Sequence, residues 1–338
     1  EPNRFGWIIE VDPYDPRSMP VKRTALGRFL HEGAEIVVAR SGQPVAYMGD
    51  DARYEYVYKF VAGGRFDPGN RQANMHLLDR GTLYTAKFNE DGTGEWLPLV
   101  FGQGPLTAAS GFRSQAEVVI NARRAADLIG ATKMDRPEDV QASPVTGNVY
   151  VALTSNDRRT TQQVDKPNPR ANNVFGHIIE LIEDGGDHTA TRFRWEIFIL
   201  GGDPSVAAHG AYYQKRTDVS PFGNPDNLAF DRAGRLWVAT DGMEGSLKVH
   251  DGLFAIETEG GMRGRSRRFL SSPPGGEVTG PAFTPDNRTL FVAIQHPGRT
   301  GGATFARPGS RWPDNRPEMP PRGSVVAIYR EDGGLIGD

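Results

Sequence analysis

Two carboxylates, Glu138 and Asp226, stand at the same position in two similar stretches of this sequence, directly after a proline. The first stretch reads Arg136-Pro-Glu-Asp-Val and the second reads Asn224-Pro-Asp-Asn-Leu. If both stretches begin equivalent strands of a repeated unit, the two acids converge, and converging carboxylates repel one another unless a cation lies between them. The recurrence therefore predicts a cation site, although acids at such positions also cap turns by accepting hydrogen bonds from backbone N–H groups.

More acids lie near the ends of expected strands. Asp50, Asp51 and Glu55 follow a strand in Gly49-Asp-Asp-Ala-Arg-Tyr-Glu, and Glu277 precedes a third copy of the repeat. The chain has 0 Cys, which excludes disulfides, thiolate metal sites and thiol nucleophiles, and its 7 His are scattered. Oxygen ligands without thiolates favour hard cations such as Ca²⁺, Mg²⁺, Mn²⁺ or ferric iron.

Arg136 lies two residues before Glu138, and side chains two apart in a strand point to the same face. An arginine beside a metal-binding glutamate suits the binding of a phosphate or carboxylate, because its planar fork can hold two oxygens. An ordinary Arg–Glu ion pair explains the same spacing equally well. The spacing leaves both interpretations open.

A repeated hairpin must position these residues. Residues 136–152, 224–239 and 279–293 each contain a short strand, a polar turn and a strand that ends in Val-Ala. Further strands are expected at residues 81–90, 176–183, 252–259 and 323–331, and outer strands at 95–100, 191–200 and 266–270. Four-stranded units at such intervals predict an all-β fold, a β-propeller with irregular blades whose innermost strands line a central channel. We expect residues 1–338 to form a single propeller domain.

Local signals complete the expected architecture. One short helix is predicted from residue 114 to 129, with Ser114 and Glu117 as a capping box and Gly130 as its stop. Residues 3–12 resemble residues 173–180 and are expected to form a blade strand. No hairpin unit precedes this strand, so we expect the domain to be incomplete at its N-terminus. Asp-Gly pairs at 91, 184, 241, 251 and 332 indicate hairpin turns, and residues 62–75, 157–171, 201–223 and 297–322 indicate long loops.

The overall charge argues against several classes of partner. Lys and Arg number 39 against 42 Asp and Glu, so the formal net charge is −3. A nucleic-acid-binding protein usually carries a basic stripe and a net positive charge, which this chain lacks. Separately, no apolar run in the sequence reaches the ~18 residues needed to cross a bilayer. We therefore expect no nucleic-acid partner and no membrane insertion.

Several motifs together resemble one family, the PhoX-type alkaline phosphatases. They span nearly the whole chain in the expected order: Lys22-Arg-Thr-Ala-Leu-Gly-Arg-Phe with His31-Glu-Gly-Ala, then Tyr47-Met-Gly-Asp-Asp-Ala-Arg-Tyr-Glu-Tyr-Val-Tyr-Lys-Phe-Val, Arg136-Pro-Glu-Asp, Gly223-Asn-Pro-Asp-Asn-Leu, Thr279-Gly-Pro-Ala-Phe-Thr-Pro-Asp and Ile294-Gln-His-Pro-Gly. The resemblance implies a propeller, six-bladed in the full-length family, that hydrolyses phosphomonoesters at a mixed Ca²⁺ and Fe³⁺ centre. It also implies export to the periplasm or the medium, and we expect a monomer.

The resemblance assigns roles to particular residues. Glu55, Glu138 and Asp226 match metal-ligand positions of the family, and Arg136 matches its phosphate-contacting arginine, so Arg136 and Glu138 are the candidate catalytic residues. Asp51, Asp139, Asn156 and Glu277 lie in matching segments and are candidate calcium ligands. The iron-ligating cysteine of the family lies upstream of Glu1, so we expect these 338 residues to bind calcium but to show little phosphatase activity.

Two alternatives remain at this stage. The stretch from Asn224 to Ala239 is also similar to blades of sugar-lactone-hydrolysing propellers, in which a central calcium polarises the ester. The other alternative is a binding propeller without catalysis, in which calcium only stiffens the blades. Phosphate-ester and lactone hydrolysis, each measured with and without a chelator, separate the three.

Overall fold

The computed structural model describes residues 2–338, which divide into two compact units. Unit 1 comprises the residues up to 142 together with 160–170 and 180–196, and unit 2 comprises 143–159, 171–179 and 197–338. Two strands, β10 (His177–Glu183) and β11 (Arg192–Leu200), pass from one unit to the other. Among the described residues, no helix has the length and apolar character needed to cross a lipid bilayer.

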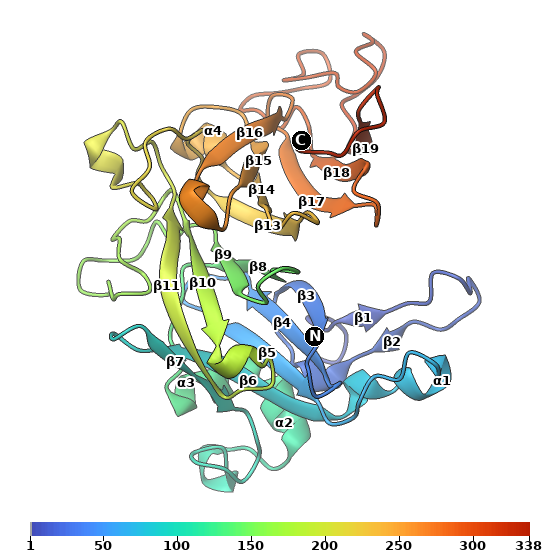
Figure 1. The fold of residues 1–338 in the computed structure, drawn as a ribbon, viewed down its shortest axis with the longest axis vertical. Helices are drawn as coiled ribbons and strands as arrows, with labels where there is room; N and C mark the ends of the chain where they lie inside the picture. The colour runs from blue at the N-terminus through green and yellow to red at the C-terminus, as the bar shows by residue number, and fades with distance from the viewer. Residues whose placement is uncertain (1) are drawn as a thin grey trace. The chain divides into compact units, whose positions relative to one another are not determined.

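Unit 1 is built on an antiparallel meander in which each strand pairs with the next along the chain (Figure 1). Its strands are β3 (His31–Val38), β4 (Pro44–Asp50), β5 (Val57–Ala62), β6 (Gly81–Phe88) and β7 (Thr93–Pro98). The unit 1 part of β11 pairs with β7, and β8 (Pro137–Ala142) lies against β3 and β4. Every residue of β4 and β5 is buried, as expected of strands covered on both faces.

Helices cover part of this meander. The long apolar side chains of β4, β5 and β6 pack against α2 (Gln115–Ile120) and α3 (Ala122–Ile129) in one core. The single helix predicted over 114–129 is two helices in the structure, because the backbone at Asn121 leaves helical geometry with φ −110 and ψ 45. Its ends were predicted correctly: the side chain of Ser114 accepts a hydrogen bond from Glu117 N, and Gly130 is left-handed with φ 79.

The first residues of unit 1 differ from the sequence prediction. The strand expected over residues 3–12 is only β1 (Ile9–Glu10), and it pairs with β2 (Val21–Lys22) rather than joining a blade. Both residues of β1 are exposed, so no apolar face holds a longer strand in place. The remaining short elements of unit 1 are α1 (Arg71–Asn74) and the 3₁₀ turns η1 (Thr24–Leu26), η2 (Leu77–Asp79), η3 (Ala108–Ser110) and η4 (Asp184–Gly186).

Unit 2 contains two complete antiparallel sheets. The first has four strands in chain order, β13 (Pro225–Phe230), β14 (Leu236–Thr240), β15 (Gly252–Ile256) and β16 (Ser266–Ser271). The second has three, β17 (Glu277–Phe283), β18 (Thr289–Gln295) and β19 (Ser324–Tyr329). Unit 2 also holds β9 (Val149–Leu153), β12 (Tyr212–Tyr213), which pairs with β11, and α4 (Met243–Ser246). These bounds confirm the predicted hairpins at 224–239 and 279–293.

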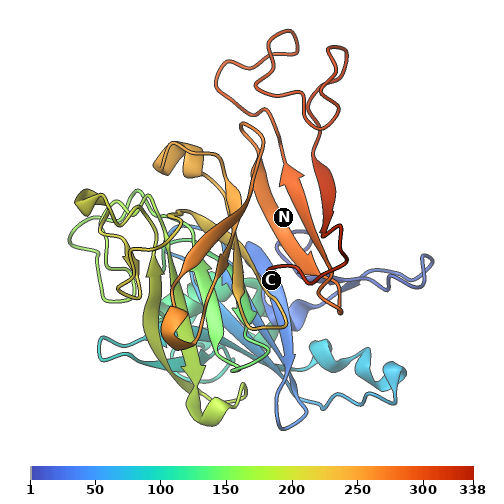
Figure 2. The same cartoon turned by 45° about the horizontal axis from the view of Figure 1, so that its top comes forward.

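The three-stranded sheet has one bare side. Val326 and Ile328 of β19 pack into a core with Trp237, whereas Val325 and Tyr329 are 72% and 69% exposed. No described strand pairs with the outer edge of β19. The loop between β18 and β19 extends away from this sheet, as Figure 2 shows in red and orange.

Candidate metal and phosphate site

Asp50, at the end of β4, is held by an arginine from helix α3. Its carboxylate is fully buried and accepts hydrogen bonds from Arg123 Nε at 2.8 Å and Arg123 Nη2 at 2.5 Å. Burial raises the pKa of Asp50, and the Arg123 guanidinium opposes that rise. Arg123 Nε also lies 3.5 Å from an oxygen of Glu55, so one guanidinium orients two carboxylates of this loop.

The next residue, Asp51, holds Arg136. Arg136 Nε and Nη2 donate to the two oxygens of Asp51 at 2.8 and 2.9 Å, and Arg136 Nη2 lies 3.1 Å from Glu138 Oε1. Arg136 has a left-handed backbone with φ 53, which non-glycine residues seldom adopt. The predicted proximity of Arg136 and Glu138 is thus confirmed, and the fork of Arg136 is oriented by a carboxylate that the spacing alone did not reveal.

The two segments that carry these groups are hydrogen-bonded together. Tyr54 N donates to Met134 O and Met134 N donates to Glu55 O, both at 2.9 Å. This pairing fixes the backbone of Glu55 beside the segment that leads into Arg136. Burial raises the pKa of Glu55 to about 7, with Arg123 opposing the rise and Asp50 adding to it.

Two further acids of unit 1 lie near Glu138 and Asp139. A carboxylate oxygen of Glu32, in β3, lies within 4.8 Å of one of Glu138. Burial, together with the charge of Asp139, raises the pKa of Glu35 to about 7. Asp139 itself accepts a hydrogen bond from Val140 N at 2.8 Å. Glu32 and Glu35 were missed from the sequence, because a β-bulge between them and a non-local contact of β3 with β8 bring them here.

Glycine at position 33 makes this arrangement possible. Gly33 has φ +69, and a Cβ on it would lie 2.6 Å from Asp139 Oδ1. A side chain here would be strained and would also displace the carboxylate of Asp139. The bulge therefore depends on glycine for the close approach of β3 to Asp139.

Unit 2 contains its own acidic group, formed by Asp226, Asp241 and Glu277. One carboxylate oxygen from each lies within 4.8 Å of the others. Glu277 accepts hydrogen bonds from Gln295 Nε2 at 3.0 Å and His296 Nε2 at 3.1 Å. Burial and the charge of Asp241 raise the pKa of Glu277 to about 7. The spacing and the all-oxygen chemistry of this group fit a hard cation.

Asp241 was missed because the Asp241-Gly pair was interpreted as a hairpin turn. The structure places Asp241 directly after β14, and Gly242 is the N-cap of α4 with φ 118. The pairing of Pro225 with Thr240 brings the end of β14 beside the start of β13, which carries Asp226. The prediction of a hairpin turn at Asp241 was wrong. The pairing of β13 with β14 instead brings Asp241 close to Asp226.

Asn156 lies in a bridge between two segments of unit 2. Its backbone pairs with Asn173, its side-chain Oδ1 accepts from Arg158 N at 3.1 Å, and it is fully buried. These contacts describe a turn, and ligation by Asn156 stays a prediction. The same holds for ligation by Glu55, Glu138, Asp226, Asp51, Asp139 and Glu277.

The antiparallel sheets and the acid-rich sites define an all-β, propeller-class protein whose carboxylates could hold metal ions beside an arginine. The sequence model described as Alkaline phosphatase PhoX matches residues 1–298. The chain therefore belongs to the PhoX alkaline phosphatase family.

One solved structure is similar over almost the whole chain. It is PhoX of Pseudomonas fluorescens in complex with vanadate, described as a transition state analogue, with 44% sequence identity and a TM-score of 0.91. The similarity covers 99% of this chain and 59% of that one, so the chain spans about three fifths of the length of this relative. A glucose dehydrogenase-type oxidoreductase of Thermus thermophilus, at 14% identity over 88% of this chain and 89% of that one, has a TM-score of 0.30 and supports no inference. No curated protein matches the chain.

Proposed function

We propose that the protein containing this chain is a metal-dependent phosphomonoester hydrolase of the alkaline phosphatase type. The observation that carries the proposal is the 44% identity, over 99% of the chain, to a PhoX whose structure holds the transition-state analogue vanadate. The chain places an arginine fork beside buried carboxylates, which is the chemistry that a phosphate ester bound to metal ions requires. The substrate class is a small phosphomonoester.

The metal ions we propose are Ca²⁺ and Fe³⁺. Within unit 2, Asp226, Asp241 and Glu277 are the proposed ligands of a cation, and within unit 1 the proposed metal ligands are Glu55 and Glu138. Carboxylate oxygens without thiolates suit hard cations, and burial together with the nearby charge of Asp241 raises the pKa of Glu277, with His296 opposing the rise. Bound cations would neutralise the phosphate oxygens and lower the barrier to displacement of the leaving group.

The residues of the chain contribute position and charge. Phosphoryl transfer needs little covalent help from a protein, so holding the phosphate in one orientation supplies much of the catalysis. Asp51 fixes the plane of the Arg136 guanidinium through two hydrogen bonds. Arg136 would then bind equatorial oxygens of the ester and stabilise their charge as the bond to the leaving group breaks.

The experiment compares hydrolysis of 4-nitrophenyl phosphate by the full-length protein and its Arg136→Ala variant at alkaline pH. We expect kcat/KM to fall on the order of 10²-fold, because a desolvated charge-assisted contact is lost, and a calcium chelator to abolish activity. The matched control is Arg322→Ala, since Arg322 makes a similar two-point contact with Asp314 at 2.9 Å on an exposed surface. Lactone hydrolysis without phosphatase activity would overturn the proposal, as would a protein that binds calcium and hydrolyses neither ester.

We also propose that the protein is periplasmic or secreted and monomeric. The location rests on membership of the family. Fractionation of the native host, and light scattering of the purified protein, test these two points.

A further inference from the structure

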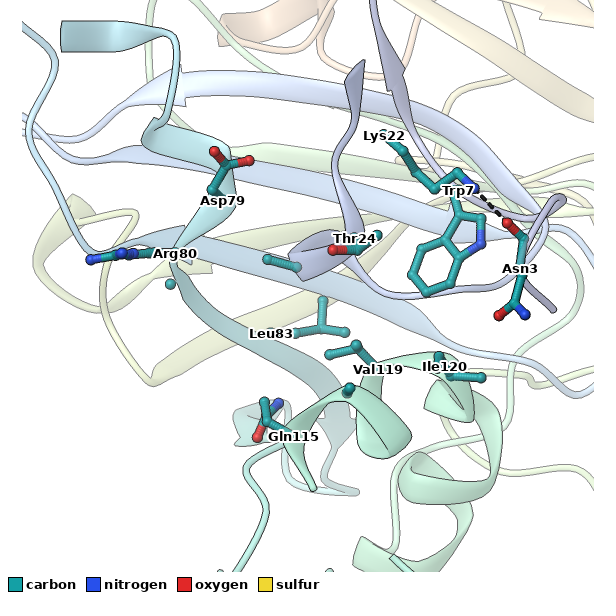
Figure 3. A pocket seen from close by; sticks show the side chains of 13 residues that line it. Asn3, Trp7, Lys22, Thr24, Asp79, Arg80, Leu83, Gln115, Val119 and Ile120 are labelled. Atoms are coloured by element: carbon teal, nitrogen blue, oxygen red, sulfur yellow. Dashed lines mark hydrogen bonds between the residues drawn. The ribbon is translucent and has the colours of Figure 1, made fainter. Parts of the chain in front are cut away.

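Unit 1 contains a pocket of ≈ 560 Å³ that includes none of the candidate metal or phosphate residues. It lies between the first residues of the chain, the segment that leads into η1, the start of β6 and the helix α2 (Figure 3). This volume is in the range of pockets that bind small organic molecules, which is ~300–1,000 Å³. Lys22, Thr24 and Ala25 of the motif that begins at Lys22 line this pocket, but the proposed phosphatase chemistry does not use it.

The floor of the pocket is apolar. Leu83 of β6 and Val119 of α2 line it and are 2% and 8% exposed, because α2 packs on the sheet at this point. Figure 3 shows Ile120 beside Val119, and the indole of Trp7 standing next to them at one end of the pocket. A flat apolar molecule could therefore rest on Leu83 and Val119 with its edge or face against Trp7.

Positive charge dominates the rim. Lys22 Nζ donates to a neutral acceptor, Asn3 O, at 2.5 Å, and Arg80 has no side-chain hydrogen bond or ion pair among the described residues. Among residues 2–338, the one acid that lines the pocket, Asp79, is already neutralised by Arg23 at 2.6 Å. The opening thus offers two cations, Lys22 and Arg80, whose charge no described carboxylate of the pocket balances.

We propose that this pocket binds a small organic anion with a flat apolar body, such as an aryl carboxylate, with the anionic group at Lys22. The apolar floor and Trp7 bind the body, and the uncompensated ammonium binds the charge. Gln115, at the edge of the pocket, is fixed by two hydrogen bonds, from its Nε2 to Leu99 O and from Phe101 N to its Oε1, both at 2.8 Å. The side of α2 that lines the pocket is therefore held in place before a ligand binds.

The experiment is calorimetric titration of the full-length protein with 2-naphthoate and with its uncharged counterpart 2-naphthamide. We expect Lys22→Gln to weaken 2-naphthoate about fivefold or more and to change 2-naphthamide less than twofold, because the variant removes charge and keeps the shape of the pocket. Ala116→Phe places a ring in the pocket from an exposed helix position and should abolish binding of both. Lys166→Gln is the matched control, since Lys166 Nζ also donates to a backbone carbonyl, Glu90 O, at 2.7 Å.

The outcomes separate this pocket from the candidate phosphate site. Binding that survives Ala116→Phe, or that Arg136→Ala abolishes, would show that the anion binds elsewhere and would overturn the proposal. Equal affinity for 2-naphthoate and 2-naphthamide would overturn the role of Lys22. So would a loss of 2-naphthoate affinity in Lys166→Gln as large as the loss in Lys22→Gln. Circular dichroism of each variant shows that a lost affinity is not lost folding.

Discussion

At the residue scale, Arg123 is the side chain whose removal should lower the stability of the chain most directly. Replacing it with methionine would leave the fully buried Asp50 carboxylate without its cation, and breaking such a pair typically costs about 3 kcal/mol or more. We expect Arg123→Met to lower the free energy of unfolding by about 2–4 kcal/mol, and Arg123→Lys by less. Urea unfolding of the chain measures both.

The control for Arg123 lies in the preceding segment. Arg113 pairs with Glu117 at 2.8 Å, but its side chain is 83% exposed, so Arg113→Met should change stability by less than about 1 kcal/mol. If Arg113→Met and Arg123→Met lower the free energy of unfolding equally, the burial of Asp50 is not the reason for the loss at position 123.

Glu277 gives a second prediction at this scale. Without a cation, Glu277→Gln should raise the melting temperature, because it removes one of three close carboxylates in unit 2. The same change should remove most of the stabilisation that added calcium gives, because a ligand is lost. Differential scanning calorimetry with calcium and with chelator tests both effects, and Glu259→Gln, at an exposed position, should show neither.

The residues of the site could be predicted from sequence only where a local pattern marks them. Glu138, Asp226 and Arg136 stand in a recurring motif, and the structure confirms the contact of Arg136 with Glu138. Glu32 and Asp241 are in no such motif, since strand pairing and a bulge bring them to their partners. Contacts of this kind depend on register between distant segments, which a single sequence does not encode locally.

At the scale of elements, Gly49 of β4 allows β8 to cross close by. A Cβ at this position would lie 1.9 Å from Glu138 O and 2.7 Å from Pro137 O, both backbone atoms. We expect Gly49→Ala to destabilise the chain by about 2 kcal/mol or more, because β8 would have to move. Hydrogen exchange of β8 should also speed up.

A second glycine supplies the contrast. Gly245 lies in α4, and a Cβ there would meet no atom within 4 Å. Gly245→Ala should leave stability unchanged or raise it by up to about 1 kcal/mol, because alanine restricts the unfolded chain. If Gly49→Ala and Gly245→Ala lower stability by similar amounts, the close approach of β8 to Gly49 is not the cause of the loss.

Elements that depend on periodicity and turn residues were predicted well, and those that depend on context were not. The hairpins β13–β14 and β17–β18 and the stop of α3 at Gly130 follow the predicted positions. The break at Asn121 and the shortness of β1 are not visible in the pattern of apolar and turn residues. The single propeller domain stays a prediction.

At the scale of the whole molecule, a buried lysine should make global stability depend on pH. Lys59 is fully buried, donates to Glu183 Oε1 at 2.9 Å and to Ala190 O at 2.7 Å, and lies 4.5 Å from the centre of the Trp96 ring. Burial lowers the pKa of Lys59 from 10.5 to about 8, with Glu183 opposing that shift. Between these two values the unfolded chain holds a proton that the folded chain has released, so stability rises with pH.

The variant Lys59→Met isolates this contribution. Below pH 8 the wild type bears the cost of a buried charge, and between pH 8 and 10.5 it is relieved of roughly 3 kcal/mol that the variant never bears. Denaturant unfolding at intervals from pH 7 to 10.5 should therefore show the wild type gaining stability relative to Lys59→Met. Parallel curves for the two proteins would show that Lys59 keeps its proton throughout.

The bare side of β19 has a consequence for handling the protein. A strand with an open edge and outward apolar side chains, here Val325 and Tyr329, is a template on which another extended chain can be added. Concentrated solutions of the chain should consequently form fibrous or amorphous aggregates from this edge before the fold itself fails. A lysine in place of Val325 would give the edge the charge with which natural sheets protect themselves, and would extend the shelf life of the preparation.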